Sequence, residues 1–168
     1  MSQQALQEEF IQLLDHQQKL IHSLCRLYYP LAEDRKDIFQ EIVLNLWKSY
    51  PSFKNQSKIS TRIYRIALNT IFSRMRKEKA LPKSESFSEK TTQIPNPQDT
   101  LALDEATQAL YEAIAELPQV DRAIILLYLE EHTYQQMATI LEMTKTNVST
   151  RINRIKSKLE KLLKLQLP

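Results

Sequence analysis

Apolar residues recur every three or four positions along almost the whole chain, and this period belongs to the α-helix. Phe10, Leu13, Leu14, Ile21 and Leu24 form one such series near the N-terminus. No stretch shows the sustained alternation with β-branched enrichment that marks a half-buried strand. The chain also has no glycine, which argues against the Gly-rich phosphate loops of nucleotide-binding folds. The sequence therefore predicts an all-α protein.

Prolines and N-capping residues divide this helical pattern into segments. Helices are expected over residues 4–29, from after Asp34 to before Pro51, from Ser60 or Thr61 as N-cap to Lys79, over 101–116, from Pro118, from Thr133 as N-cap to Leu141, and over 145–159. Residues 81–100 hold three prolines and no apolar period, so they are expected to form a flexible linker. The sequence thus predicts two small helical domains, 1–80 and 101–168.

The charged residues are spread unevenly, although the net charge is only +3. Residues 34–80 hold 11 basic and 4 acidic residues, and residues 117–168 hold 8 basic and 5 acidic. Between them, residues 81–116 hold 2 basic and 7 acidic residues. Two basic blocks separated by an acidic one indicate two anion-binding surfaces on one chain. The alternative is that these charges lie on ordinary solvated helix faces.

Residue types that usually carry chemistry are scarce. Cys25 is the only cysteine, which excludes an internal disulfide, and it is expected to be buried and inert rather than reactive. His16, His22 and His132 make no pair at helical spacing for a metal ion. No paired carboxylates or nucleophile–base pair stand out, so we expect neither an enzyme nor a cofactor. The N-terminus lacks a secretory signal and no apolar run could span a membrane, which predicts a cytoplasmic protein.

The segment from Thr133 to Lys158 has the pattern of two helices joined by a tight turn, although its corner, Leu141-Glu142-Met143, contains no glycine. At 100° per residue, the second of these helices places an apolar stripe against the first. The stripe consists of Val148, Ile152, Ile155 and Leu159. A positive φ at Glu142 would cost on the order of 1 kcal/mol, which a packed domain can tolerate. The segment predicts a helix-turn-helix, with an ordinary helical hairpin as the alternative.

The opposite face of this last helix is polar and holds Thr146, Thr150, Asn153, Arg154 and Ser157, with Arg151, Lys156 and Lys158 on its flanks. Residues 143–168 include seven basic residues and a single acidic one. Short polar groups and one arginine suit base edges in the major groove of DNA, while flanking cations suit phosphates. The pattern therefore favours a DNA-reading helix.

A second polar stripe lies on the third helix, and it consists of Arg62, Arg65, Asn69, Ser73 and Arg76. A polar loop with Phe53, Lys54, Asn55 and Lys58 comes directly before it. Such a stripe beside a mixed polar and aromatic loop can hold an unstacked single strand. A solvated basic helix is the alternative. The second helix exposes Leu44 among polar residues, as a surface for a protein partner does.

Three motifs in this order, DRKDIFQEIVLNLW, FKNQSKISTRIYRIALN and LPQVDRAIILLYLEEHTYQQMATILEMTKTNVSTRINRIKSKL, resemble a bacterial sigma factor of the extracytoplasmic-function type, in the sigma-70 family. The resemblance covers about residues 10–80 and 100–163. It implies that the first domain, region 2, clamps the coiled coil of the largest-subunit clamp of RNA polymerase and opens the −10 element. It also implies that the second, region 4, reads the −35 element.

The resemblance carries the family's contacts to matching positions. Core RNA polymerase would be bound by Asp37, Gln40, Glu41 and Asn45. The −10 element would be bound by Phe53, Lys54, Asn55, Lys58, Arg62, Arg65 and Asn69. The −35 element would be bound by Thr146, Ser149, Thr150, Arg151, Asn153 and Arg154, with Arg151 nearer the phosphates. Family members usually have Trp at Arg62, Gly at Asn55 and Glu142, and often a basic residue at Ser149.

These patterns favour a promoter-specificity subunit that is not an enzyme, with core RNA polymerase and promoter DNA as partners. Factors of this kind are commonly held inactive by an anti-sigma factor. The first alternative is a stand-alone helix-turn-helix regulator, which would bind duplex DNA as a dimer without the polymerase. The second is an adaptor that docks on the polymerase without reading DNA, and it would not respond to the loss of Arg154.

Overall fold

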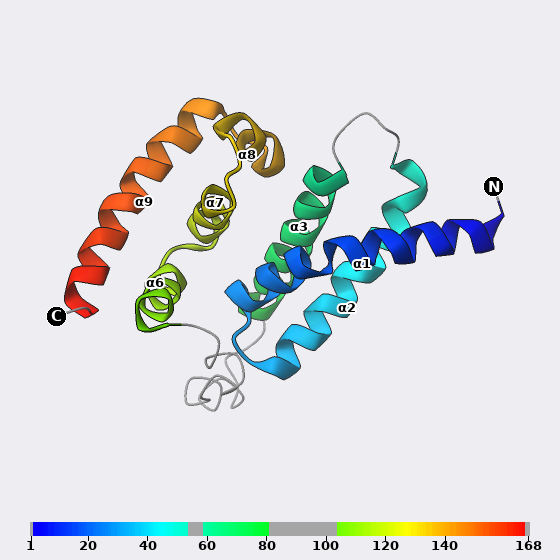
Figure 1. Cartoon of the computed structure of the whole chain (residues 1–168), viewed down its shortest axis with the longest axis horizontal. Helices are drawn as coiled ribbons and strands as arrows, with labels where there is room; N and C mark the ends of the chain where they lie inside the picture. The colour runs from blue at the N-terminus through cyan, green and yellow to red at the C-terminus, as the bar shows by residue number, and fades with distance from the viewer. Residues whose placement is uncertain (1, 54–58, 81–103, 167–168) are drawn as a thin grey trace. The chain divides into compact units, whose positions relative to one another are not determined.

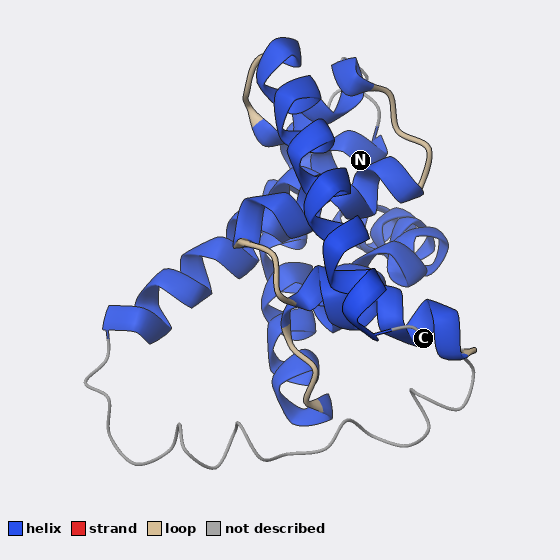
Figure 2. Cartoon of the chain, turned by 90° about the vertical axis from the view of Figure 1, so that its left-hand side faces the viewer, coloured by secondary structure: helices blue, strands red, loops and turns tan. Residues whose placement is uncertain are grey.

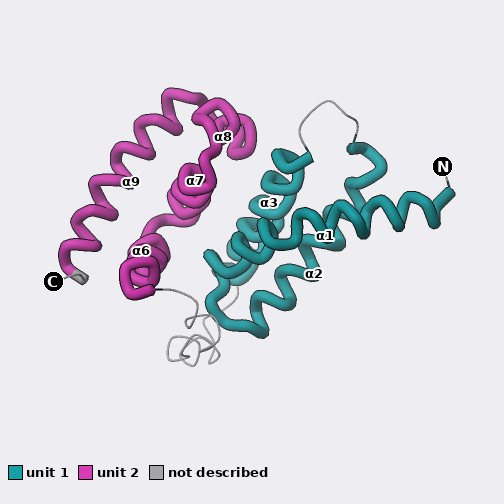
Figure 3. Tube along the Cα trace, viewed as in Figure 1, with its two compact units in different colours: residues 1–84 teal, residues 85–168 magenta. Residues whose placement is uncertain are grey.

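The computed structural model describes residues 2–53, 59–80 and 104–166, and the chain divides into two compact units, residues 1–84 and 85–168 (Figure 3). Every regular element in the described ranges is a helix, and they contain no strand (Figure 2). The prediction of an all-α protein is therefore confirmed. The expected linker, residues 81–100, lies outside the described residues.

Unit 1 is a three-helix bundle (Figure 1). Its elements are α1 (Gln3–Tyr28), α2 (Ala32–Ser49), the short 3-10 helix η1 (Tyr50–Ser52) and α3 (Ile59–Ala80). The core lies where the three long helices meet, and it includes Ile21, Leu24, Ile38, Ile42, Ile63, Leu68 and Ile71. Burying these side chains provides the main driving force for the unit.

Two helix starts in unit 1 differ from the sequence expectation. Helix α2 begins at Ala32, so Glu33 and Asp34 lie in its first turn, where the positive end of the helix dipole favours carboxylates. Helix α3 begins at Ile59, so Ser60 and Thr61 lie inside the helix and neither is its N-cap. Hydroxyl residues are compatible with a first turn as well as with a cap, and their presence alone did not fix the boundary.

Unit 2 consists of α6 (Glu105–Ala115), α7 (Gln119–Leu129), α8 (Tyr134–Leu141) and α9 (Lys145–Gln166) (Figure 1). The long helix α9 packs against each of the three shorter helices. Its apolar stripe is buried as expected and consists of Val148, Ile152, Ile155 and Leu159. Ile114, Leu117, Ile124, Leu127 and Met137 complete this core.

The corner between α8 and α9 forms without glycine. Glu142 adopts the left-handed conformation, with φ 55° and ψ 48°, and ends α8. At the other end of α8, Thr133 and Gln136 form a capping box, with distances of 2.8 and 3.0 Å between the backbone nitrogens and side-chain oxygens. The Thr144 hydroxyl accepts a bond of 3.0 Å from the Asn147 backbone N–H at the start of α9. The predicted helix-turn-helix is therefore confirmed.

Candidate nucleic-acid interface

The outer face of α9 is polar and exposed in its first three turns. Thr146, Thr150, Asn153 and Arg154 are exposed, and Ser149 is half-buried. The buried stripe on the opposite side fixes the rotation of α9 about its axis, so these side chains point away from the core of unit 2. A helix with this face can enter the major groove of duplex DNA.

Arg151 is held in place by two side chains. Its Nη1 lies 3.0 Å from Oδ1 of Asp121 in the first turn of α7, and its Nε donates to Oδ1 of Asn147 at 3.2 Å. The side chain of Asp121 is only 9% exposed, and that of Arg151 is 31% exposed. The sequence pattern placed Arg151 correctly on the flank of α9 but did not indicate its partner Asp121.

A second flanking cation packs on α7. The Lys156 ammonium lies 4.4 Å from the centroid of the Tyr128 ring, and its hydrogen bond with the Tyr128 hydroxyl raises the pKa of that lysine. Lys156 is charged at neutral pH, as lysines with an ordinary pKa of about 10.4 are. Further along α9, Lys158 and Lys161 are exposed. The flank of α9 keeps a positive charge that can meet phosphates.

In unit 1, Arg62 joins the start of α3 to η1. Its Nη1 donates to the Ser52 carbonyl at 2.9 Å, and its guanidinium carbon lies 4.6 Å from the centroid of the Phe53 ring. The Phe53 ring also packs against Tyr50, with 5.5 Å between centroids. Arg65 is half-buried and Asn69 is exposed along the same helix. Lys54, Asn55 and Lys58 lie outside the described residues.

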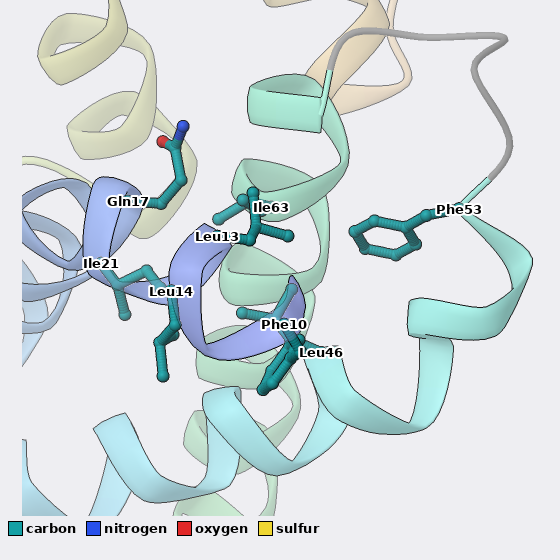
Figure 4. Close-up of a pocket in the computed structure, with 8 residues that line it drawn as sticks. All are labelled: Phe10, Leu13, Leu14, Gln17, Ile21, Leu46, Phe53 and Ile63. Carbon is teal, nitrogen blue, oxygen red and sulfur yellow. The ribbon is translucent and has the colours of Figure 1, made fainter. Parts of the chain in front are cut away.

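An apolar hollow lies beside Phe53, between α1, α2 and α3 (Figure 4). It is lined by Phe10, Leu13, Leu14, Gln17, Ile21, Leu46, Phe53 and Ile63. Gln17 is the single polar residue of this lining, so the hollow offers few hydrogen bonds to a polar ligand. Phe10 also contacts Trp47 and Tyr50, with centroids 5.1 and 5.3 Å away. These rings anchor η1 and Phe53 on the bundle.

The candidate partner surface on α2 is partly tied to α3. Glu41 pairs with Arg74 at 3.6 Å, and Asn45 Nδ2 donates to the Thr70 hydroxyl at 2.9 Å. By contrast, Asp37 and Gln40 are exposed, and Leu44 is 54% exposed between these polar positions. The surface therefore combines positions fixed by α3 with side chains open to solvent.

Three further observations concern the thiol, metal ligation and helix hydrophobicity. Cys25 is buried as expected, and burial raises the pKa of its thiol to about 12. The described residues contain no cluster of three or more His, Cys, Asp or Glu side chains placed to hold a metal ion. None of the described helices contains an apolar stretch of the length that a membrane span needs.

Two family models match the chain. Sigma-70 region 2 matches residues 13–81, and Sigma-70, region 4 matches residues 107–159. The chain is 28% identical to ECF RNA polymerase sigma factor SigW of Bacillus subtilis, over 94% of this chain and 90% of that protein. It is also 28% identical to ECF RNA polymerase sigma-E factor of Escherichia coli, over 92% and 86% of the two chains.

Two solved structures share the fold. The sigma factor RpoE from Bartonella quintana, in complex with the anti-sigma factor NepR, matches with a TM-score of 0.73 and 22% identity, over 94% of this chain and 98% of that one. CnrH in complex with the cytosolic domain of CnrY matches with a TM-score of 0.70 and 18% identity, over 95% and 90%. At these identities the likeness concerns the fold.

Proposed function

Because the chain belongs to the sigma-70 family, as a sigma factor of the extracytoplasmic-function type, we propose that it is the promoter-specificity subunit of an RNA polymerase. It binds the core polymerase and directs initiation at promoters that carry its −10 and −35 elements. The observation that carries this proposal is the presence of both sigma regions, in order, in one chain. A stand-alone regulator would need only the helix-turn-helix, so it leaves unit 1 without a role.

Unit 2 reads the −35 element through α9. Thr150 and Arg154 contact base edges in the major groove, and Thr146, Ser149 and Asn153 line the same face. Arg151 contacts the phosphates from the flank. The exposure of this face and the buried stripe behind it support these assignments.

Unit 1 binds the opened −10 element with residues that precede α3 in the sequence and with the outer face of α3. The residues that bind it before α3 are Phe53, Lys54, Asn55 and Lys58, and those on α3 are Arg62, Arg65 and Asn69. A single strand held here would meet cations along its phosphates and an aromatic ring beside its bases. The contact of Arg62 with Ser52 and Phe53 supports this assignment, because it holds the Phe53 ring beside the first turn of α3.

The core polymerase binds α2 through Asp37, Gln40, Glu41 and Asn45. The exposed Leu44 lies among these polar residues, which is the composition of a protein interface with an apolar centre and a polar rim. Phosphodiester chemistry belongs to the polymerase, so this chain acts without a catalytic site or cofactor of its own. A factor that works with the polymerase acts in the cytoplasm.

We assign the two readers to residues 1–80 and 101–168, with residues 81–100 as the linker between them. When two domains that each bind DNA modestly are linked in one chain, binding of the first raises the effective concentration of the second at its own element. This strengthens overall binding only when the two elements lie at the right spacing. An anti-sigma factor is a further partner, and the support for it is that the similar sigma factor RpoE was solved in complex with the anti-sigma factor NepR.

The test is co-elution of the purified chain with bacterial core RNA polymerase on a sizing column, followed by run-off transcription of genomic DNA. The chain alone with duplex DNA serves as the control. A stable complex that starts transcripts at discrete sites, together with little DNA binding by the chain alone, is the expected result. Binding to duplex DNA without any affinity for the polymerase would instead favour the stand-alone regulator.

A further inference from the structure

Asp121 is a buried carboxylate in the first turn of α7. Thr70 is the other polar residue that is buried to this degree among those the structure describes. A carboxylate taken out of water is strongly unfavourable unless a cation or several hydrogen bonds compensate it. Asp121 lies at the positive end of α7, and its Oδ1 pairs with the guanidinium of Arg151 at 3.0 Å, so both interactions compensate the buried charge. The pair is therefore a fixed part of unit 2.

The geometry around Arg151 fixes the plane of its guanidinium. This group carries five N–H donors in one plane. Asp121 accepts one from Nη1, and Asn147 accepts the one from Nε at 3.2 Å. Two acceptors on different helices, α7 and α9, define the orientation of the fork. The side chain remains 31% exposed, so its other donors can reach a ligand on the surface of α9.

This arrangement changes what Arg151 can contribute to DNA binding. An arginine that moves freely on a helix flank attracts any phosphate and leaves the helix register undetermined. Paired with Asp121, it adds little net charge at long range, but a phosphate bound by its remaining donors would be held at one fixed position relative to Thr150 and Arg154. Phosphate contacts of this kind set the register in which neighbouring side chains meet the bases.

We propose that Asp121 is a positioning residue for −35 recognition, whose buried carboxylate holds Arg151 so that α9 binds the duplex in a single register. The pair raises discrimination between −35 sequences and lowers attraction to DNA of any sequence. This inference rests on the proposed function, because it requires α9 to read duplex DNA.

The test compares Asp121→Asn with a control, Glu112→Gln, in the full chain bound to bacterial core polymerase. Asn keeps the size and one acceptor oxygen of Asp but loses the charge. Glu112 is exposed on α6, where it accepts a 3.5 Å bond from Gln108 in the same helix, so its substitution changes the net charge equally without touching α9. Each holoenzyme is measured on a promoter found by run-off transcription and on variants with single substitutions in the −35 element.

For Asp121→Asn, the ratio of initiation rates on the original and the substituted −35 elements should fall about threefold to tenfold. The slope of log affinity against log salt should steepen by up to about one, because Arg151 then acts as an unpaired cation. Glu112→Gln should keep both values. A ratio and a slope that both stay at the original values in Asp121→Asn would overturn the proposal, even if the melting temperature falls.

If Asp121→Asn does not fold, Arg151→Lys replaces it in the test. Lysine keeps the charge but lacks the planar fork that bonds Asp121 and Asn147 together. The same loss of discrimination is expected, and unchanged discrimination would reject the positioning role. Failure of the proposed function has a different signature, since the original holoenzyme would then form no complex or would ignore every −35 substitution.

Discussion

Asn45 on α2 donates a hydrogen bond of 2.9 Å from Nδ2 to the Thr70 hydroxyl on α3, and that hydroxyl donates to the Ile66 carbonyl at 2.7 Å. Thr70 is buried, so this chain of bonds lies between the two helices that share the largest contact in unit 1. One residue proposed to bind the polymerase is thus oriented from behind by a residue that the polymerase cannot reach.

Thr70→Val should destabilise unit 1 by about 1–2 kcal/mol, because valine keeps the shape but leaves the Asn45 amide without this acceptor. Binding of the core polymerase should weaken as well. Trp47 is the only tryptophan and lies in unit 1, so its fluorescence in urea follows this unit. As a control in the same unit, Ser23→Ala removes a hydroxyl bond to the Lys19 carbonyl at the surface of α1, and it should change the free energy of unfolding by less than about 0.5 kcal/mol.

Glu142→Gly should stabilise unit 2 by about 0.5–1 kcal/mol, since glycine adopts a φ of 55° without the steric cost that a Cβ brings. Scanning calorimetry would detect the rise in the melting temperature of unit 2, while the Trp47 transition should stay in place. Glu116→Gly is the matched control, because Glu116 ends α6 with φ −83°. Glycine there should stabilise nothing, and equal gains at both positions would reject the explanation.

The spacing of the apolar residues was sufficient to predict the helical fold. Each helix buries one face, and the positions of its apolar residues in the local sequence identify that face. The buried face of α9 shows this, since Val148, Ile152 and Ile155 are all buried as expected. Helix starts were less predictable. Asp34 and Thr61 resemble boundary residues locally, but both lie within first turns.

The exposed face of α9 was predictable for the same reason. Once the buried stripe of a helix is known, helical geometry determines which residues face outward, and these include Thr150 and Arg154. The partner of Arg151 was not predictable. Asp121 lies 30 residues earlier in the chain, and in the sequence it resembles any acidic residue in a first helical turn. Only the packing of α7 against α9 brings the two side chains together.

Cys25 should resist thiol reagents in the folded chain. Burial raises the pKa of this thiol to about 12, so at about pH 8 only about one thiol in ten thousand is ionised, and the thiolate is the reactive form. Labelling by a disulfide reagent should therefore be slow in buffer and fast in urea, where the pKa returns to its ordinary value. Rapid labelling of the folded chain would show that the environment around Cys25 opens readily.

Arg154→Ala should reduce binding of the holoenzyme to its −35 element by about 1–3 kcal/mol and relax the preference at one base pair. Arg154 is exposed, so the melting temperature of unit 2 should not change. Lys158→Ala is the matched control on the flank of the same helix. It should weaken binding to all sequences alike and reduce the salt slope by about one, because a phosphate contact carries charge without base preference. Equal losses on all sequences for both variants would mean that Arg154 contacts a phosphate, and base reading would then fall to Thr150 and its neighbours on α9.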